Sequence, residues 1–457
     1  MNKGPEYLFR NESAFQHYGH LLDGIKSVEN TQEENYFEEN KMLIMLETGV
    51  KNDCYRQGLD YSNIDSILTD ATTPANQQAV GGVAGQPGIA GTGVDPLGKA
   101  WHVRNTLAMI RQIFPKLYSR ELVSVQPVST DSARLYYMDI MRSDAYTDAD
   151  GNPVAAGQKQ NVGIDKAHTY ADSYEYRGYD FSTNQNDPKV NRLNMEIQSC
   201  HFQLQELKLN IQVTNEIQRD LEAYHGMNAI SILTKAMSDE IALGWDRKVI
   251  SQMYIAAQRN YYELRSLALQ NKTGQITDKV SRTPMTATFD MEYNPISISG
   301  TQSWEDRDHY LATFFEKLED VATQMYTRTF VRPNFLIVPT DIAAMLRKMK
   351  AFDSKTIDMT RQIVGTENRY KAGTLMDMLY NVYVDPYATD VLVGYKGSGW
   401  TKTGVVFLPY ELGYMTSTFE DPEKFVFKKG MLSRAGIKCV NEDYYGIVQI
   451  TRPTPAS

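Results

Sequence analysis

The sequence predicts an α+β protein, and three observations carry this prediction. Residues 207–213 alternate apolar and polar side chains, which is typical of a half-buried strand. Apolar residues then recur every three or four positions from 230 to 253, which predicts a helix of about six to seven turns with one apolar stripe. The other strand patterns are discontinuous around this helix, and the chain has no internal repeat. A long helix without Cys or His ligands favours a scaffolding role.

Size and composition limit the classes of protein that fit. At 457 residues the chain is long enough for about two to four packed units. Its 42% hydrophobic and 23% charged residues are ordinary for a soluble globular protein. No apolar run approaches ~18 residues, and the first residues lack a signal-peptide pattern, so we expect no membrane partner. The net charge of -9 argues against tight nucleic-acid binding.

Cysteine and tyrosine usage adds two expectations. Cys54, Cys200 and Cys439 lie far apart without paired spacing, which predicts free thiols in a reducing cytoplasm. Tyrosine is abundant at 29 residues. Because Tyr offers a large contact area at low entropic cost, this abundance is a weak indication of assembly.

The first hundred residues differ from the rest. Thr31 and Glu34 form a capping-box pattern before a short predicted helix that carries Phe37, Leu43 and Leu46. Residues 75–99 consist mainly of Gly, Ala, Gln and Pro. Such a segment cannot bury enough side chain to fold alone, so we interpret it as a linker or an arm ordered by another surface.

A helix with Leu107, Ile110 and Phe114 on one side follows and is expected to end at Pro115. Residues 122–128 and 134–141 then fit strands. Residues 143–188 are polar and lack aliphatic periodicity, and a loop of this length is normally functional or ordered from outside. Strand patterns on both sides of it predict a two-stranded projection whose outer part docks on a neighbour.

The C-terminal half predicts mixed elements. Residues 304–325 fit a helix, and residues 335–338 fit a central strand because all four are apolar. Thr340 or Asp341 is the expected N-cap of the next helix. Residues 382–384 and 391–394 are expected to form a strand–turn–strand pair around Asp385 and Pro386, and residues 425–428 and 446–450 fit long terminal strands.

Candidate ligand-binding motifs were weighed against simpler interpretations. The segment from Gly394 to Thr401 has glycines like a phosphate-binding loop, but no Gly-Lys-Ser/Thr closes the spacing, so a turn at the end of a strand is preferred. His17 and His20 could form half of a metal site, but no second pair completes it, so surface histidines are preferred. His225 is interpreted as a residue at a bend.

Three further patterns also favour structural interpretations. Asp148, Asp150 and Asn152 resemble half of a calcium loop, but the twelfth position is Lys159, so a turn is preferred. Cys200 and His201 are neighbours in a strand and would point to opposite faces. We therefore expect no catalytic, cofactor-binding or metal-binding residues, no cofactor and no enzymatic activity.

Several blocks, in order, resemble one family. Residues 220–250 are similar to the spine-helix region of major capsid proteins of T-even-type tailed bacteriophages, through the pairs Asp220-Leu221, His225-Gly226, Glu240-Ile241 and Asp246-Arg247. Five other segments, in the same order along the chain, also resemble that family: residues 114–128, 288–294, 328–346, 392–415 and 425–437. The resemblance covers roughly residues 101–450.

The resemblance implies a Hong Kong 97-type capsid fold. It divides the chain into an N-terminal arm and linker (1–100), a peripheral domain that begins at 101–142, continues with the spine helix at 190–260 and returns at 419–457, an extended loop (143–189) and an axial domain (261–418). Lys159 and Lys166 fall in the extended loop, where some relatives place a cross-linking lysine, and solvated lysines are the preferred interpretation. Larger members insert a small domain near this loop, where this chain has only about fifty polar residues.

The implied function is that of a major capsid protein, which forms hexamers and pentamers of an icosahedral head around double-stranded DNA. The implied partners are other copies, together with scaffolding, portal, vertex or decoration proteins, with packaged DNA contacted weakly. The implied location is the virion, after assembly in the bacterial cytoplasm. A vertex subunit or a cellular nanocompartment shell protein remains the first alternative, and an unrecognised metal- or nucleotide-dependent enzyme is the second. We expect free protein, but not assembled protein, to be protease-sensitive within residues 75–99 and 143–188.

Overall fold

The structure is a computed structural model. It describes residues 12–19, 22, 32–57, 61, 99–117, 119–130, 134–144, 146–147, 153–154, 156, 158–159, 192–258, 285–291, 304–349, 352–353, 370–376, 379–397, 404–416, 418–421 and 423–452. The expectations for residues 75–98 and for most of residues 143–188 lie outside these ranges.

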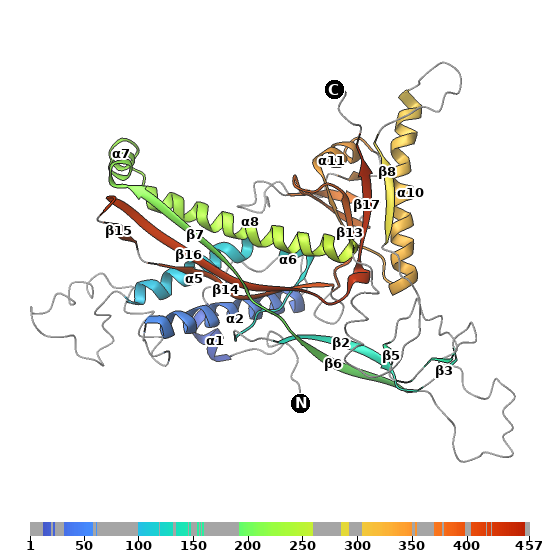
Figure 1. Cartoon of the computed structure of the whole chain (residues 1–457), viewed down its shortest axis with the longest axis horizontal. Helices are drawn as coiled ribbons and strands as arrows, with labels where there is room; N and C mark the ends of the chain where they lie inside the picture. The colour runs from blue at the N-terminus through green and yellow to red at the C-terminus, as the bar shows by residue number, and fades with distance from the viewer. Residues whose placement is uncertain are drawn as a thin grey trace, which may run out of the picture.

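Figure 1 shows the helices of the described part of the chain. They are α1 (Glu12–Tyr18), α2 (Gln32–Gln57), α5 (Lys99–Lys116), α6 (Ser119–Leu122), α7 (Asn215–His225), α8 (Ala229–Gln258), α10 (Trp304–Thr329), α11 (Thr340–Leu346) and the 3-10 helix η6 (Glu442–Tyr444). No helix in the described ranges has both the length and the apolar character that crossing a membrane requires.

Two large sheets organise the strands. The five-stranded sheet contains β1 (Ser124–Val125), β14 (Val405–Met415), β16 (Val426–Cys439) and β15 (Phe419–Asp421), with β7 (Gln205–Thr214) on the other side of β16. The seven-stranded sheet has the order β10 (Phe352–Asp353), β11 (Tyr370–Leu375), β12 (Tyr380–Val384), β9 (Phe335–Val338), β13 (Val391–Gly394), β17 (Tyr445–Thr451) and β8 (Thr286–Asp290).

The smaller sheets lie beyond these two. We use the name ribbon for the antiparallel pair of β2 (Arg134–Arg142) and β6 (Leu193–His201), to which the short β5 (Gln158–Lys159) adds. The ribbon leaves the end of the five-stranded sheet and extends away from it (Figure 1). A separate hairpin pairs β3 (Tyr146–Thr147) with β4 (Pro153–Val154).

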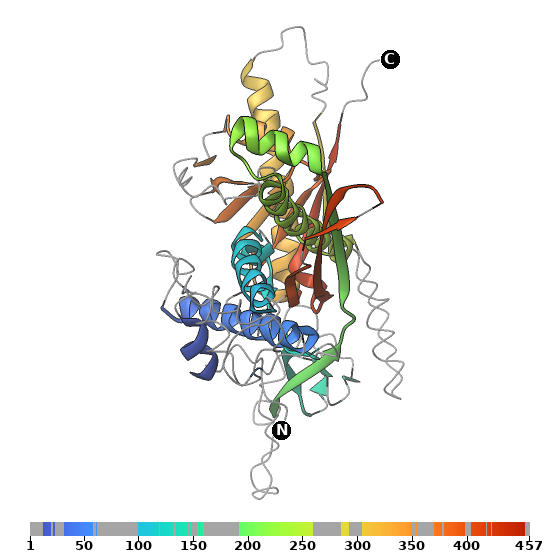
Figure 2. The same ribbon diagram turned by 90° about the vertical axis from the view of Figure 1, so that its left-hand side faces the viewer.

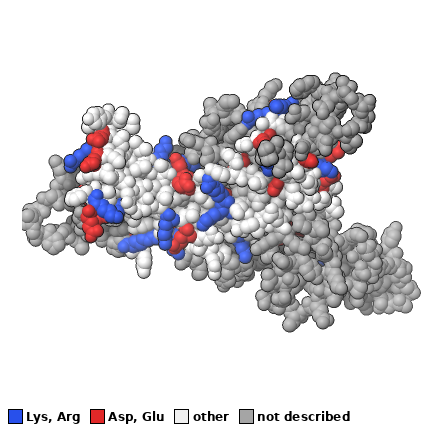
Figure 3. All heavy atoms as spheres, turned by 45° about the horizontal axis from the view of Figure 1, so that its top comes forward, with Lys and Arg blue, Asp and Glu red and all other residues white. Residues whose placement is uncertain are grey.

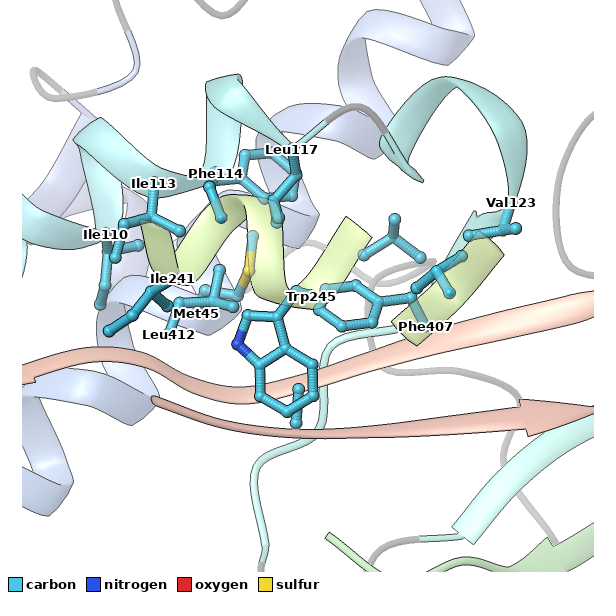
Figure 4. Packing of buried hydrophobic residues seen from close by; sticks show 14 of the residues in the cluster. Met45, Ile110, Ile113, Phe114, Leu117, Val123, Ile241, Trp245, Phe407 and Leu412 are labelled. Atoms are coloured by element: carbon cyan, nitrogen blue, oxygen red, sulfur yellow. The ribbon is translucent and has the colours of Figure 1, made fainter. Parts of the chain in front are cut away.

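Helix α8 lies against the five-stranded sheet on one side and against α5 and α6 on the other. The predicted stripe is confirmed, because Met237, Ile241, Trp245, Val249 and Met253 are all buried. The Trp245 indole projects toward the strands beside Phe407, with 5.8 Å between ring centroids, and its Nε1 donates to Ser433 Oγ at 2.8 Å (Figure 4). The buried surface is wider than one stripe because the helix is covered on two sides.

Both faces of the seven-stranded sheet are buried. Strand β9 contributes Phe335 and Ile337 to the core around α8, and Leu336 and Val338 to the core under α10 and α11. Because successive side chains point to opposite faces, a strand covered on both sides needs apolar residues at every position. This explains the continuous apolar run that predicted a central strand.

The N-terminal expectation of a short helix is wrong. Helix α2 has 26 residues and packs against α5 and β14, with Met42, Leu43 and Leu46 buried in the main core. Figure 2 shows α1 and α2 lying below α5 as part of the folded body. The apolar spacing continues through Val50 and Cys54, which also are buried, so the helix is longer than expected.

Three local expectations also need correction. Strands β12 and β13 do not pair with each other, because β9 lies between them, parallel to β12 and antiparallel to β13. The N-cap of α11 is Pro339, whose carbonyl accepts from the Ala343 N–H at 2.9 Å. Helix α5 runs one residue past Pro115, because proline in the last turn still accepts a helical conformation.

The chain does not run from strand into one helix. Gly226 ends α7 in the left-handed conformation, with φ 61°, and its N–H donates to Glu222 O. Asn228 then caps α8, with Oδ1 accepting from the N–H groups of Ile230 and Ser231 at 3.0 and 3.2 Å. Glycine adopts positive φ without strain, so the His225-Gly226 bend is a helix end.

Candidate assembly surfaces

The ribbon carries an apolar face. In its register Ile140 is opposite Met195, and Arg142 is opposite Leu193, so these four residues share one face. Met195 is 65% exposed and Leu193 is 56% exposed, and Ile140 and Ile197 also are exposed. A two-stranded ribbon is marginally stable alone, so an uncovered apolar face marks a surface that a partner can bury.

An ion pair fixes one end of the ribbon. Arg192 donates from its backbone N–H to Asp144 Oδ2 at 2.7 Å and from its guanidinium to Asp144 Oδ1 at 3.1 Å. The hydrogen bond from the Arg192 side chain lowers the pKa of the Asp144 carboxyl. Ser143 N–H also donates to Arg192 O at 2.9 Å. The strands are therefore held together where residues 145–191 leave the ribbon.

The opposite end of the molecule carries a second exposed apolar group, which we name the tip. Helix α7 has no buried residue, and its Ile217 and Tyr224 are exposed, as are Met227 and the nearby Phe419 and Phe425. Asn215 joins the two parts, because its N–H donates to Phe425 O at 3.4 Å and its side chain to Glu420 Oε1 at 3.3 Å. Helix α7 begins at Thr214, whose Oγ1 accepts from Ile217 N–H.

A shallow pocket of about 310 Å³ lies on the face of the five-stranded sheet that turns away from α8. Its lining residues come from β7, β14 and β16 and are Lys208, Leu209, Asn210, Tyr414, Thr416, Gly430, Met431 and Leu432. Gly430 lies among these lining residues, and because it has no side chain the surface is hollowed there. The pocket offers apolar contact without a group of catalytic residues.

Charged residues are interspersed in sign on the described surface that Figure 3 shows. Two carboxylates are instead buried and join elements. Arg56 of α2 donates to both oxygens of Glu411 in β14, at 2.5 and 2.8 Å, and lies over the Tyr414 ring. Ser119 N–H at the start of α6 donates to the buried Asp246 carboxylate of α8 at 2.9 Å. These contacts join α2 to β14 and α6 to α8.

The sequence matches the family model described as "Major capsid protein Gp23" over residues 102–454. The chain belongs to the Gp23 major capsid protein family. This confirms the family that the resemblance of separate blocks predicted. The structure confirms the α+β class.

Two phage major capsid proteins show how far this sequence differs from its relatives. The chain is 26% identical over 265 residues to the major capsid proteins of Enterobacteria phages T4 and T6. The alignment covers 57% of this chain, and 46% and 48% of the two relatives. The chain thus spans about half the length of the curated relatives it matches.

Solved structures similar to this capsid family member include one from Microbacterium phage Oxtober96, with a TM-score of 0.39 and 9% identity, covering 73% of this chain and 91% of that one. The capsid of Myoviridae phage XM1 gives a TM-score of 0.37 and 8% identity, with the same coverage. Such low TM-scores establish nothing alone, and the assignment rests on the sequence match.

The candidate ligand residues lie partly within the described ranges. His17 lies half-buried on α1 beside the Tyr18 ring, whereas His20 lies outside the described residues. Cys200 and His201 are adjacent in β6, as expected, and Lys396 follows the end of β13. Within the described ranges, no three His, Cys, Asp or Glu side chains form a group that could hold a metal.

Other predicted residues fall partly outside the described ranges. Asp148, Asp150 and Asn152 lie outside them, between β3 and β4 in the sequence. Lys166 also lies outside, and Lys159 is part of β5. The tip was missed at the sequence level, although the pattern Ile217, Leu221, Tyr224 on a helix beside Phe425 could have indicated it.

Proposed function

We propose that this protein is a major capsid protein, whose copies form hexamers and pentamers of an icosahedral shell around double-stranded DNA. Membership of the Gp23 family supports a structural role over an enzymatic one. The ribbon is the observation that carries the proposal, because its face exposes four apolar side chains: Ile140, Leu193, Met195 and Ile197.

The ribbon's direction indicates what covers it. It continues from β7 through residues 202–204 and extends away from the body of its own chain (Figure 1). Folding back onto its own sheet would require breaking this strand path. Burial of Leu193 and Met195 contributes about 25 cal/mol per Å² of apolar surface, so a neighbouring subunit that covers them gains binding energy. Assembly and ordering of the ribbon are therefore coupled.

The proposal includes a division of labour along the chain. Residues 1–100 serve as arm and linker with α2 docked on the peripheral domain, 143–189 as the extended loop, and 261–418 as the axial domain. The protein resides in the virion after assembly in the bacterial cytoplasm. Scaffolding, portal, vertex or decoration proteins are its further partners, and the net charge of -9 favours weak contact with DNA.

Substitution of the ribbon's apolar face tests the proposal. Met195→Lys places a charge where a neighbour would bury the side chain, and Asn194→Lys places the same charge on the opposite face as a control. Electron microscopy of the purified proteins should show shells for wild type and Asn194→Lys, and at least about tenfold fewer for Met195→Lys. Equal shell yield from both variants would contradict the proposal.

Shell diameter and contents separate the related alternatives. A head protein gives particles that hold DNA-sized contents, whereas a cellular nanocompartment protein gives shells without a genome. A vertex subunit gives pentamers that close no shell alone.

A further inference from the structure

Strand β7 forms an outer edge of the five-stranded sheet. Its ten residues pair in unbroken antiparallel register with β16, from Gln205 opposite Ala435 to Thr214 opposite Val426. In the described part of the chain, β16 is the only strand that pairs with β7. Helices α7 and α8 also contact β7. Figure 2 shows β7 at the side of the folded body.

The hydrogen-bond phase shows which backbone groups point outward. Asn215 N–H donates to Phe425 O, and this pair continues the β7–β16 register, so odd-numbered residues of β7 bond to β16. Thr416 N–H donates to Gly430 O on the other side of β16, which gives the same phase independently. The N–H and C=O groups of four residues therefore face the outer edge: Glu206, Lys208, Asn210 and Gln212.

Proline, bulges, short length or charge normally prevent an exposed edge strand from pairing with another chain. Strand β7 has no proline, and its register shows no shift. Its charges are neutralised within the chain, because Lys208 Nζ lies 2.6 Å from Glu206 Oε2, and Arg434 Nε lies 3.1 Å from Glu206 Oε1. An incoming strand would meet no unpaired charge along this row.

We propose that the outer edge of β7 accepts an extended strand from a second copy of this chain. The inference rests on the proposed function, since a shell places other copies beside this edge. The edge also continues directly into the ribbon through residues 202–204, so one neighbour can cover both surfaces. Strand addition supplies main-chain hydrogen bonds whatever the side chains, which fits the polar residues on this row.

Proline scanning tests the edge without breaking the existing ladder. Asn210→Pro removes an outward N–H, which an edge strand tolerates, while Asn210→Ala removes the side chain and keeps the N–H. We expect Asn210→Pro to keep wild-type circular dichroism and thermal stability within a few degrees but to assemble at least about tenfold less. Assembly equal to that of Asn210→Ala overturns the proposal.

Amide hydrogen exchange in the wild-type protein tests the proposal without any variant. In wild-type shells, the amides of Glu206, Lys208, Asn210 and Gln212 should exchange at least about a hundredfold more slowly than in the unassembled protein. The odd-numbered amides of β7 should already be protected in both. Unchanged exchange at the four outward amides overturns the strand addition, whereas failure of the wild-type chain to form shells contradicts the proposed function itself.

Discussion

Lys396, in the loop after β13, is held among charged residues of α2 and α6. Its Nζ donates to Arg120 O at 2.7 Å, and Asn334 fixes its backbone by accepting from Lys396 N–H at 2.9 Å and donating to Lys396 O at 2.7 Å. Burial, with the nearby Lys41 charge, lowers the pKa of Lys396 to about 8. Glu38 and Glu121 oppose this shift.

This lowered pKa predicts a pH-dependent stability. Between pH 8 and the ordinary lysine pKa of about 10.4, the unfolded chain holds a proton that the folded chain has lost, so stability rises with pH. Urea unfolding of wild type and Lys396→Met should diverge in favour of wild type by up to about 3 kcal/mol as the pH rises from 7 to 10. Other lysines cancel in this difference, so a constant difference contradicts the prediction.

At the scale of elements, an ion pair joins the end of α2 to β14. Glu411 is fully buried in β14, at a break in the β14–β16 register, and Arg56 is its bidentate partner. Arg56→Met should cost about 3–5 kcal/mol in denaturant unfolding because it leaves a buried carboxylate unpaired. Adding Glu411→Leu should restore much of this loss. A double variant no more stable than Arg56→Met would show that the unpaired Glu411 carboxylate is not the source of the loss.

Patterns that depend on a single element were predicted well. The stripe of α8, the alternation of β7 and the apolar run of β9 each report burial by neighbours on known faces. Pairing was predicted less well, because β9 reaches its place between β12 and β13 through contacts distant in sequence. The length of α2 was missed because its polar partners, Glu411 and Tyr410, lie more than three hundred residues away.

The ribbon and the edge of β7 also differ in how far the sequence predicts them. The ribbon could be predicted because strand patterns flank one long polar segment. The edge of β7 could not, since the direction of a backbone N–H depends on which residue of β16 lies opposite. An alternation pattern gives the faces of a strand but leaves its two edges equivalent.

For the molecule as a whole, the two cores share the seven-stranded sheet. Strand β17 gives Ile447 to the core around α8 and Val448 to the core under α10. Calorimetry of the unassembled protein should therefore show one cooperative transition. Trp245→Phe and Phe314→Ala, one in each core, should both lower that single peak. Two peaks that respond separately would show independent domains.

The path from Leu193 to Thr214 has a mechanical meaning. It runs as β6 and β7 from the ribbon to the cap of α7, a length of roughly 70 Å at strand rise. Tension applied to the ribbon by a displaced neighbour would act along β7, parallel to the strand. The ten residue pairs with β16 would then resist sliding together, rather than opening one after another.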